Sequence, residues 1–225
     1  MTESKQMTEK KETAVETADF DRLVAEDGLS IGMLCGSETV LFIKTGQGGT
    51  VYGEEQKYLR LGEWVRDTYG FSVLVSATEL DRREDFQRDM DCVRELLPAS
   101  RGDIYYLGVS KGGLIGCWYG AEEPRIRRIL TVNAPLGINF HNRTAPALER
   151  LTAEGLPPAS PSANRLTMVY GTRDPSYRYL PFLRERLERL DRFCLKIAEG
   201  ADHNLQGSAV SLTEMVEKWL LFDVK

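Results

Sequence analysis

The sequence predicts an α/β fold: a doubly wound, mainly parallel sheet with an antiparallel hairpin at its N-terminal edge. Three observations lead to this prediction. Short β-rich runs alternate with longer stretches of helical periodicity, as in successive β-α-β units. The first two strand-like runs are separated by only three residues, Gly36 to Glu38, which is too few for a crossover helix. The composition, with 42% hydrophobic and 28% charged residues, is that of an ordinary globular protein.

The order of the expected elements follows from the pattern of apolar residues. Strand-like runs cover residues 29–35, 39–44, 71–76, 104–107, 126–132, 166–170 and 193–197. Helical segments cover residues 54–69, 81–97, 111–119, 180–190 and 212–220. In the second helical segment, for example, Phe86, Met90 and Val93 fall on one face. Because their connection is so short, we expect the first two strands to pair with each other as an antiparallel hairpin.

Two parts of the chain depart from this rhythm. Residues 135–164 are rich in Pro, Ala and Asn, and we expect a small insertion with room for one short helix near residues 146–154. Residues 1–18 are polar and lack apolar periodicity, so we expect a disordered tail. Residues 19–225 are then expected to form a single domain.

Charge and hydropathy exclude several classes of function. The net charge is −5 and the pI is about 5.3, which argues against non-specific binding to nucleic acid. The longest apolar runs, such as residues 40–43, are far shorter than the ~20 residues of a membrane helix, so we expect no membrane insertion. The first residues lack the apolar stretch of a secretory signal, and we therefore expect a cytoplasmic protein.

One short motif carries the strongest chemical signal. Residues 108–112 read G-V-S-K-G, a match to G-x-S-x-G, and they lie between a predicted strand and a predicted helix. This context places Ser110 on a sharp strand-to-helix turn. A serine hydroxyl is a poor nucleophile unless a base removes its proton. The prediction of a reactive serine therefore requires a histidine and a third group that orients it.

The sequence supplies both groups at the expected edge of the sheet. His203 lies in G-A-D-H-N, which follows the last predicted strand, and Asp174 lies in G-T-R-D-P, which follows the preceding one. Because the carboxyl ends of parallel strands meet at one edge of a sheet, we expect Ser110, Asp174 and His203 to lie close together. Serine, acid and histidine also follow one another in this order in α/β-hydrolases.

On these three motifs, the chain resembles the α/β-hydrolase superfamily over about residues 29–225. The resemblance implies that Ser110 is the nucleophile, His203 the general base and acid, and Asp174 the orienting carboxylate. It implies serine-dependent hydrolysis of carboxylic esters or related acyl compounds through an acyl-enzyme. The partner would be a small-molecule acyl substrate, with no metal or organic cofactor.

The resemblance also implies an oxyanion hole made of backbone N–H groups. One donor is the residue after the nucleophile, Lys111. The other follows the early central strand, where many members of the superfamily have His-Gly and this chain has Thr45-Gly46. By that match, Gln47 is the second donor.

Alternatives remain at several positions. Asp202, next to His203, and Asp81 are rival acids, although adjacent side chains seldom orient each other well. Lys111 could form a serine–lysine dyad, and the glycine-rich residues 46–49 could bind phosphate, although they lack the spacing of known phosphate loops. His141 lies in the insertion and matches no catalytic position. Thioesterase, peptidase or carbon–carbon hydrolase activity on the same residues, and a non-catalytic binding protein, remain alternative functions.

Overall fold

The computed structural model describes residues 19–80, 82–96, 102–138, 143–152, 165–187 and 193–224. Its centre is an eight-stranded sheet with the order β1-β2-β4-β3-β5-β6-β7-β8. The strands are β1 (Arg22–Val24), β2 (Ile31–Leu34), β3 (Ser37–Lys44), β4 (Phe71–Ser76), β5 (Ile104–Val109), β6 (Ile126–Val132), β7 (Leu166–Gly171) and β8 (Phe193–Ala198). Strands β3 to β8 are parallel, whereas β2, near one edge, runs antiparallel to both of its neighbours, β1 and β4. The predicted fold class is confirmed.

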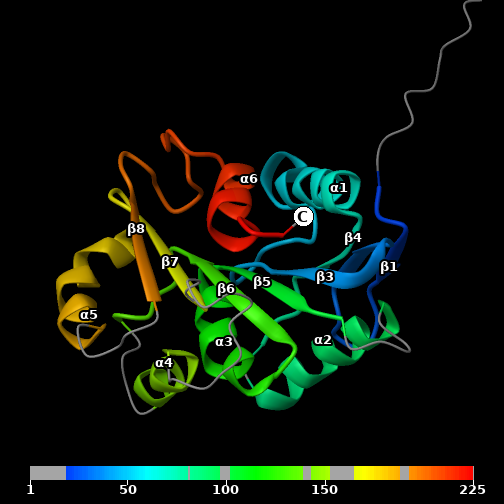
Figure 1. Cartoon of the computed structure of the whole chain (residues 1–225), viewed down its shortest axis with the longest axis horizontal. Coiled ribbons are helices and arrows are strands. Elements are labelled where there is room, and N and C mark those ends of the chain that lie inside the picture. The colour runs from blue at the N-terminus through cyan, green and yellow to red at the C-terminus, as the bar shows by residue number, and fades with distance from the viewer. Residues whose placement is uncertain are drawn as a thin grey trace, which may run out of the picture.

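Helices cover both faces of the sheet, as Figure 1 shows. One face carries α1 (Lys57–Tyr69) and α6 (Leu212–Met215), which continues as the π-helical turn η4 (Val216–Leu220). The other carries α2 (Arg83–Leu96), α3 (Lys111–Tyr119), α4 (Thr144–Thr152) and α5 (Leu180–Leu187). The short turns η1 (Glu54–Gln56), η2 (Gly120–Glu122) and η3 (Pro175–Tyr179) complete the elements. Central strands such as β4 and β7 are buried on both sides, and a separate core lies between the sheet and each layer of helices.

The predicted pairing of residues 29–35 with 39–44 is wrong, although an antiparallel edge is present. Strand β4 lies between β2 and β3, and β2 pairs with β4 on one side and with β1 on the other. The short connection crosses the start of β4 instead of folding back. Gly36 makes this crossing possible, since a Cβ there would lie 2.3 Å from the carbonyl oxygen of Phe71.

Other elements agree closely with the sequence pattern. The predicted strands 71–76 and 126–132 and the predicted helix 111–119 match β4, β6 and α3 residue for residue. The short helix expected near residues 146–154 is α4, which begins two residues earlier, at Thr144. The tail at residues 1–18 and much of the insertion, with His141, lie outside the described residues.

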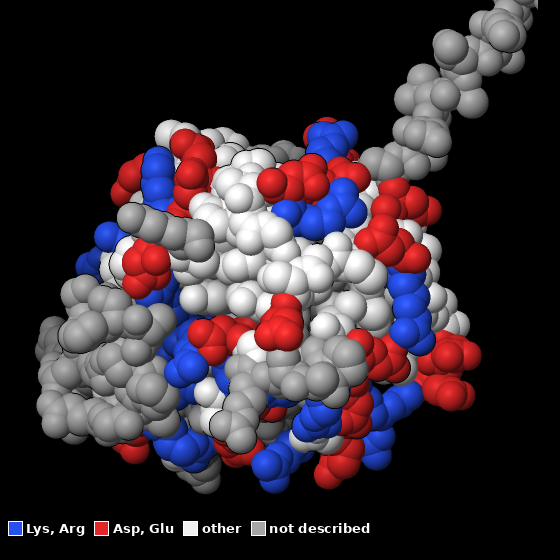
Figure 2. Space-filling view, turned by 45° about the vertical axis from the view of Figure 1, so that its right-hand side comes forward, with Lys and Arg blue, Asp and Glu red and all other residues white. Residues whose placement is uncertain are grey.

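The surface does not gather charge of one sign on the face seen in Figure 2. Lysines and arginines alternate there with aspartates and glutamates around a broad uncharged area. None of the helices in the described ranges is long and apolar enough to span a bilayer.

Candidate active site

Ser110 lies at the junction of β5 and α3, in a backbone conformation that L-residues rarely adopt. Its φ is 53° and its ψ is −123°. The turn depends on small neighbours. A Cβ on Gly108 would lie 2.5 Å from Gly113 Cα, and one on Gly112 would lie 2.3 Å from the carbonyl oxygen of Lys44. The sharp turn predicted from the G-x-S-x-G motif is therefore present, and the strain indicates a position that the surrounding structure enforces.

A buried tyrosine supports this turn from below. The hydroxyl of Tyr106 donates a hydrogen bond of 2.9 Å to the carbonyl oxygen of Gly112. Its ring fills the space beside Gly116, where a Cβ would lie 2.2 Å from the ring. Burial raises the pKa of Tyr106 well above its usual value, so the hydroxyl remains a donor.

His203 is held by a buried carboxylate from the neighbouring strand end. Its Nδ1 lies 2.5 Å from Oδ2 of Asp174. The Asp174 side chain is fully buried, whereas 49% of the His203 side chain is exposed. Asp174 also caps η3, where Pro175 occupies the first turn and the Ser176 amide donates to Oδ1 at 2.6 Å.

The protonation of this pair follows from its contacts. Burial alone would raise the pKa of Asp174, but hydrogen bonds from His203 and Ser176 outweigh it, and the pKa is lowered. The hydrogen bond to Asp174 raises the pKa of His203, against the smaller opposing effect of partial burial. An ionised Asp174 therefore fixes the imidazole ring and favours its protonated form.

The rival acids have different positions. Asp202 accepts hydrogen bonds of 2.9 Å from the backbone amides of Asn204 and Gln206, so its carboxylate shapes its own loop. Asp81 lies outside the described residues. Of the two carboxylates weighed beside His203 that the structure describes, Asp174 is the one that contacts the ring.

Asn133 also positions the histidine loop, and the sequence analysis missed it. Its Nδ2 donates to the carbonyl oxygens of Asp202 and His203, both at 3.1 Å. Its Oδ1 accepts from the Gly171 amide at 2.8 Å. The residue has a φ of 52°, which asparagine tolerates better than most residues. The available signal was an asparagine directly after β6, at the same edge as the motifs.

Ser110 and His203 line the same cavity, which has a volume of about 550 Å³. The remaining lining residues are Gly46, Gln47, Gly48, Gly49, Thr50, Gly53, Glu54, Lys57, Tyr58, Val109 and Asn204. The Ser110 hydroxyl makes no hydrogen bond within the described ranges, and none joins it to His203. Catalytic contacts of this kind often form only when substrate is bound.

The glycine-rich loop after β3 passes beside Ser110. A Cβ on Gly46 would lie 3.0 Å from Ser110 Cβ. The Gly48 amide donates to Glu79 at 2.8 Å and the Gly49 amide donates to Gly46 at 3.1 Å. By contrast, the Gln47 amide has no hydrogen-bond partner in the part of the chain that the structure describes. An amide without a partner at this place can donate to a bound oxyanion.

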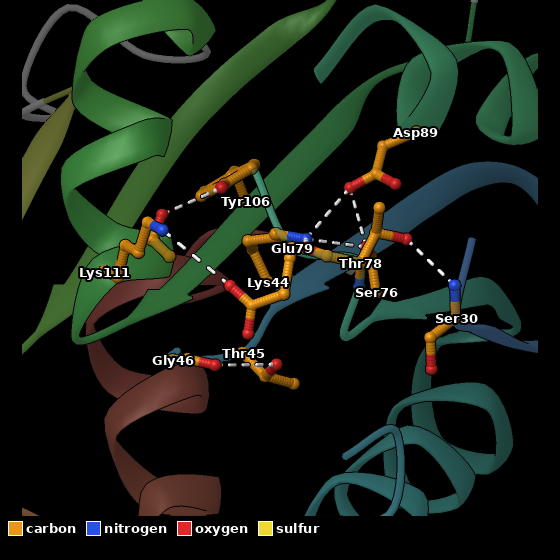
Figure 3. A network of polar contacts seen from close by, with 11 residues as sticks. Ser30, Lys44, Thr45, Gly46, Ser76, Thr78, Glu79, Asp89, Tyr106 and Lys111 are labelled. Atoms are coloured by element: carbon orange, nitrogen blue, oxygen red, sulfur yellow. Dashed lines mark hydrogen bonds and ion pairs between the residues drawn. The ribbon is translucent and has the colours of Figure 1, made fainter. Parts of the chain in front are cut away.

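The Lys111 side chain is directed to Glu79, as Figure 3 shows; the two charged groups lie 3.7 Å apart. Glu79 thus links the start of α3 to the glycine-rich loop. This contact draws the Lys111 ammonium group away from the role of a base for Ser110.

A second polar cluster lies at the end of β3, next to the start of the loop (Figure 3). Lys44, the last residue of β3, places its Nζ 3.2 Å from Asp89 Oδ2 and 2.9 Å from Ser76 Oγ, and it also donates to the carbonyl oxygen of Thr78. Ser76 Oγ donates to Asp89 at 2.6 Å. Lys44 and Asp89 are almost completely buried, and burial lowers the pKa of Lys44 and raises that of Asp89. The cluster fixes the end of β3, from which the loop begins.

Comparison with known proteins supports the fold. No protein-family model matches the chain, and no curated protein matches it. Among solved structures, an α-β serine hydrolase homologue from Coxiella burnetii is 15% identical, with a TM-score of 0.62 and coverage of 90% of this chain and 97% of that one. Est1E from Butyrivibrio proteoclasticus is 15% identical, with a TM-score of 0.59 and coverage of 88% and 94%. The esterase domain of a Rhodothermus marinus protein is 14% identical, with a TM-score of 0.60 and coverage of 85% and 91%.

Proposed function

We propose that this chain, which has the α/β-hydrolase fold, is a serine hydrolase that cleaves carboxylic esters or related acyl compounds through an acyl-enzyme. One observation carries the proposal. Ser110 lies on a strained turn in the same cavity as His203, and the His203 ring is held by the buried carboxylate of Asp174. This set of groups can activate a hydroxyl and return its proton to a leaving group.

The proposed reaction has two halves. In the first, Ser110 Oγ attacks the substrate carbonyl while His203 Nε2 takes its proton, and Asp174 stabilises the imidazolium that forms. The backbone N–H groups of Lys111 and Gln47 donate to the oxyanion of the tetrahedral intermediate. His203 then gives the proton to the leaving alcohol. In the second half, His203 activates a water molecule that releases the acyl group from Ser110.

A fluorophosphonate probe tests the nucleophile directly. Wild-type protein should be labelled at Ser110, as located by mass spectrometry of the digested protein, and Ser110→Ala should not be labelled. Ser208→Ala is the matched control, because Ser208 lines the adjoining cavity of about 210 Å³ but its hydroxyl donates to the Val210 carbonyl at 2.7 Å. Labelling of the control should equal that of the wild type.

Turnover provides the second readout. Ser110→Ala should lower kcat for a p-nitrophenyl ester by about 10⁴-fold or more while the far-ultraviolet circular dichroism stays unchanged. A panel of esters, thioesters and amides with the same acyl group then ranks the bond that is cleaved. A folded protein that binds these compounds but releases no alcohol, thiol or amine, and gives no labelled serine, would be a binding protein and would contradict the proposal.

A further inference from the structure

A lysine also lines the cavity that holds Ser110 and His203. Lys57, the first residue of α1, lines both this cavity and the adjoining one, and both cavities also include His203. The lysine is half-buried. Its charge also reaches the proposed base, since it opposes the effects of Asp174 and Asp202 that raise the pKa of His203.

The Lys57 ammonium group has no ion pair or hydrogen bond within the described ranges. Its Nζ lies 5.3 Å from the centroid of the Tyr58 ring, a cation–π contact that leaves its N–H groups available. Burial lowers the pKa of Lys57, with only partial compensation from the charges of Glu54 and Asp202. An anion from the solution would relieve this cost.

The neighbouring carboxylates, Asp202 and Glu54, accept hydrogen bonds from groups other than Lys57. Asp202 accepts from the Asn204 and Gln206 amides, as described above, and exposed Glu54 accepts from the Gln206 side chain at 3.3 Å. The first amides of α1 are also used, because the Lys57 amide donates to the Glu54 carbonyl and the Tyr58 amide donates to Tyr52. The side chain of Lys57, and not the helix terminus, is therefore the group available to an anion.

We propose that Lys57 binds a carboxylate of the substrate, so that the preferred substrates are esters that carry a second, ionised acid group. This inference rests on the proposed function and names its substrate class. Arg173 and Arg178 lie close to Asp174 in the sequence, but neither lines this cavity in the described structure. The Arg178 guanidinium lies over the Tyr179 ring. Among the described residues that line the Ser110 cavity, Lys57 is the one lysine or arginine.

Matched methyl esters test the preference. Monomethyl glutarate offers an ionised carboxylate, its carboxamide analogue is the neutral isostere, and an analogue with a trimethylammonium group is the cationic one. The acetyl ester of glycolic acid, against its amide, places the carboxylate on the alcohol side instead. In at least one pair, kcat/KM for the anion should exceed that for the amide by about 10-fold or more, the value of one charge-assisted hydrogen bond.

Variants of α1 assign the preference to one side chain. Lys57→Gln should abolish the anion-to-amide ratio, and Lys57→Arg should keep it. Arg60→Gln is the control, because Arg60 lies on the same helix, is exposed and lines a neighbouring hollow that contains neither Ser110 nor His203. It should change neither the ratio nor the basal rate. A ratio near one in wild type, a preference for the cationic ester, or a ratio that survives in Lys57→Gln would overturn the inference.

The His203 ring gives a readout that does not depend on turnover. The chain has two histidines, so His141→Gln assigns the ring signals in proton nuclear magnetic resonance. Loss of the Lys57 charge should raise the His203 pKa, because one of the two effects that lower it, the other being partial burial, is then removed. Glutarate should shift the His203 signal in wild type at lower concentration than in Lys57→Gln. Equal titrations would refute the role of Lys57 even if no ester is hydrolysed, whereas absent hydrolysis with unequal titrations would refute only the proposed function.

Discussion

Two pairs of an aspartate and a cationic or basic residue lie near the carboxyl ends of the strands, and they differ mainly in access to solvent. In both pairs the aspartate is fully buried. The partner in the first, His203, is half-exposed and lines the cavity, whereas the partner in the second, Lys44, is 3% exposed. A proton can therefore pass between His203 and a molecule bound in the cavity. Lys44 and Asp89 can exchange protons with solvent only if the structure opens.

The electrostatics of the two pairs differ in the same way. For His203 the hydrogen bond to its aspartate is the largest effect, and the pKa rises. For Lys44 burial is the largest effect, and the pKa falls in spite of Asp89. Under the proposed function, the accessible pair takes part in the reaction and the buried pair stabilises the fold, so access to the cavity distinguishes the two roles. Four predictions test this division, beginning with the largest expected effect.

Replacement of the acid in the solvent-accessible pair, His203 and Asp174 (the open pair), should lower the rate of the proposed reaction. Asp174→Asn should lower kcat by roughly 10³–10⁴-fold, because an amide favours the wrong tautomer of His203. Asp202→Asn is the matched control and should cost far less, since the Asp202 carboxylate accepts its hydrogen bonds from backbone amides and not from the His203 ring. Steady-state kinetics on a neutral ester measure both. A larger loss in Asp202→Asn would assign the acid to that residue instead.

Replacement of the acid in the buried pair, Lys44 and Asp89 (the closed pair), should lower the stability of the protein more than its activity. Asp89→Asn leaves the Lys44 ammonium group buried without its counter-charge, and the free energy of unfolding should fall by about 3–5 kcal/mol in urea titrations. The kcat of the folded fraction should fall much less than in Asp174→Asn. The double variant Lys44→Met/Asp89→Leu removes both charges and should recover most of the stability. A stable Asp89→Asn protein with kcat as low as that of Asp174→Asn would contradict the division.

The open pair also depends on Asn133, which holds the histidine loop. Asn133→Gly removes the three hydrogen bonds and suits a φ of 52°, so it tests the side chain without backbone strain. We expect kcat to fall by roughly 10²-fold, as for a catalytic group displaced by about 1 Å. Reactivity of Ser110 toward the fluorophosphonate should fall in parallel. Unchanged kinetics would show that the loop keeps its position without Asn133.

The smallest expected effect is on the pH dependence. Only a neutral imidazole can accept the Ser110 proton. The value of kcat/KM should therefore rise with pH through the pKa of His203 in the free enzyme. Because the hydrogen bond to Asp174 raises this pKa, the midpoint should lie above the ordinary value of ~6.5. Asp174→Asn should lower the midpoint, whereas Asp89→Asn should leave it in place. A wild-type midpoint below that ordinary value would contradict the electrostatics of the open pair.

The sequence predicted the bounds of the strands better than the pairing between them. The bounds of β4 and β6 were predicted correctly because runs rich in apolar and β-branched residues stop at turn-forming residues, such as Gly70 before β4 and Asn133 after β6. The pairing of β2 was not, because whether β3 or β4 lies beside it depends on contacts between distant segments. Strand β1 spans three residues, too few for a pattern to show.

The candidate site was predicted to the extent that its residues form local motifs. Ser110, Asp174 and His203 each lie in a short recognisable segment, and the structure brings them to one edge. Lys44 and Asp89 lie 45 positions apart, so neither lies in a motif with the other. The available signals were a lysine at the end of an apolar strand and an aspartate on the apolar face of α2 beside Met90.

The left-handed backbone at Ser110 has an evolutionary consequence. A residue held at such a φ costs on the order of 1–3 kcal/mol, and glycine would avoid most of this cost. Selection for stability alone would therefore favour glycine over Ser110, and this one substitution would remove the proposed nucleophile. Under the proposed function, selection for stability and selection for activity therefore favour different residues at this position, glycine for the first and serine for the second.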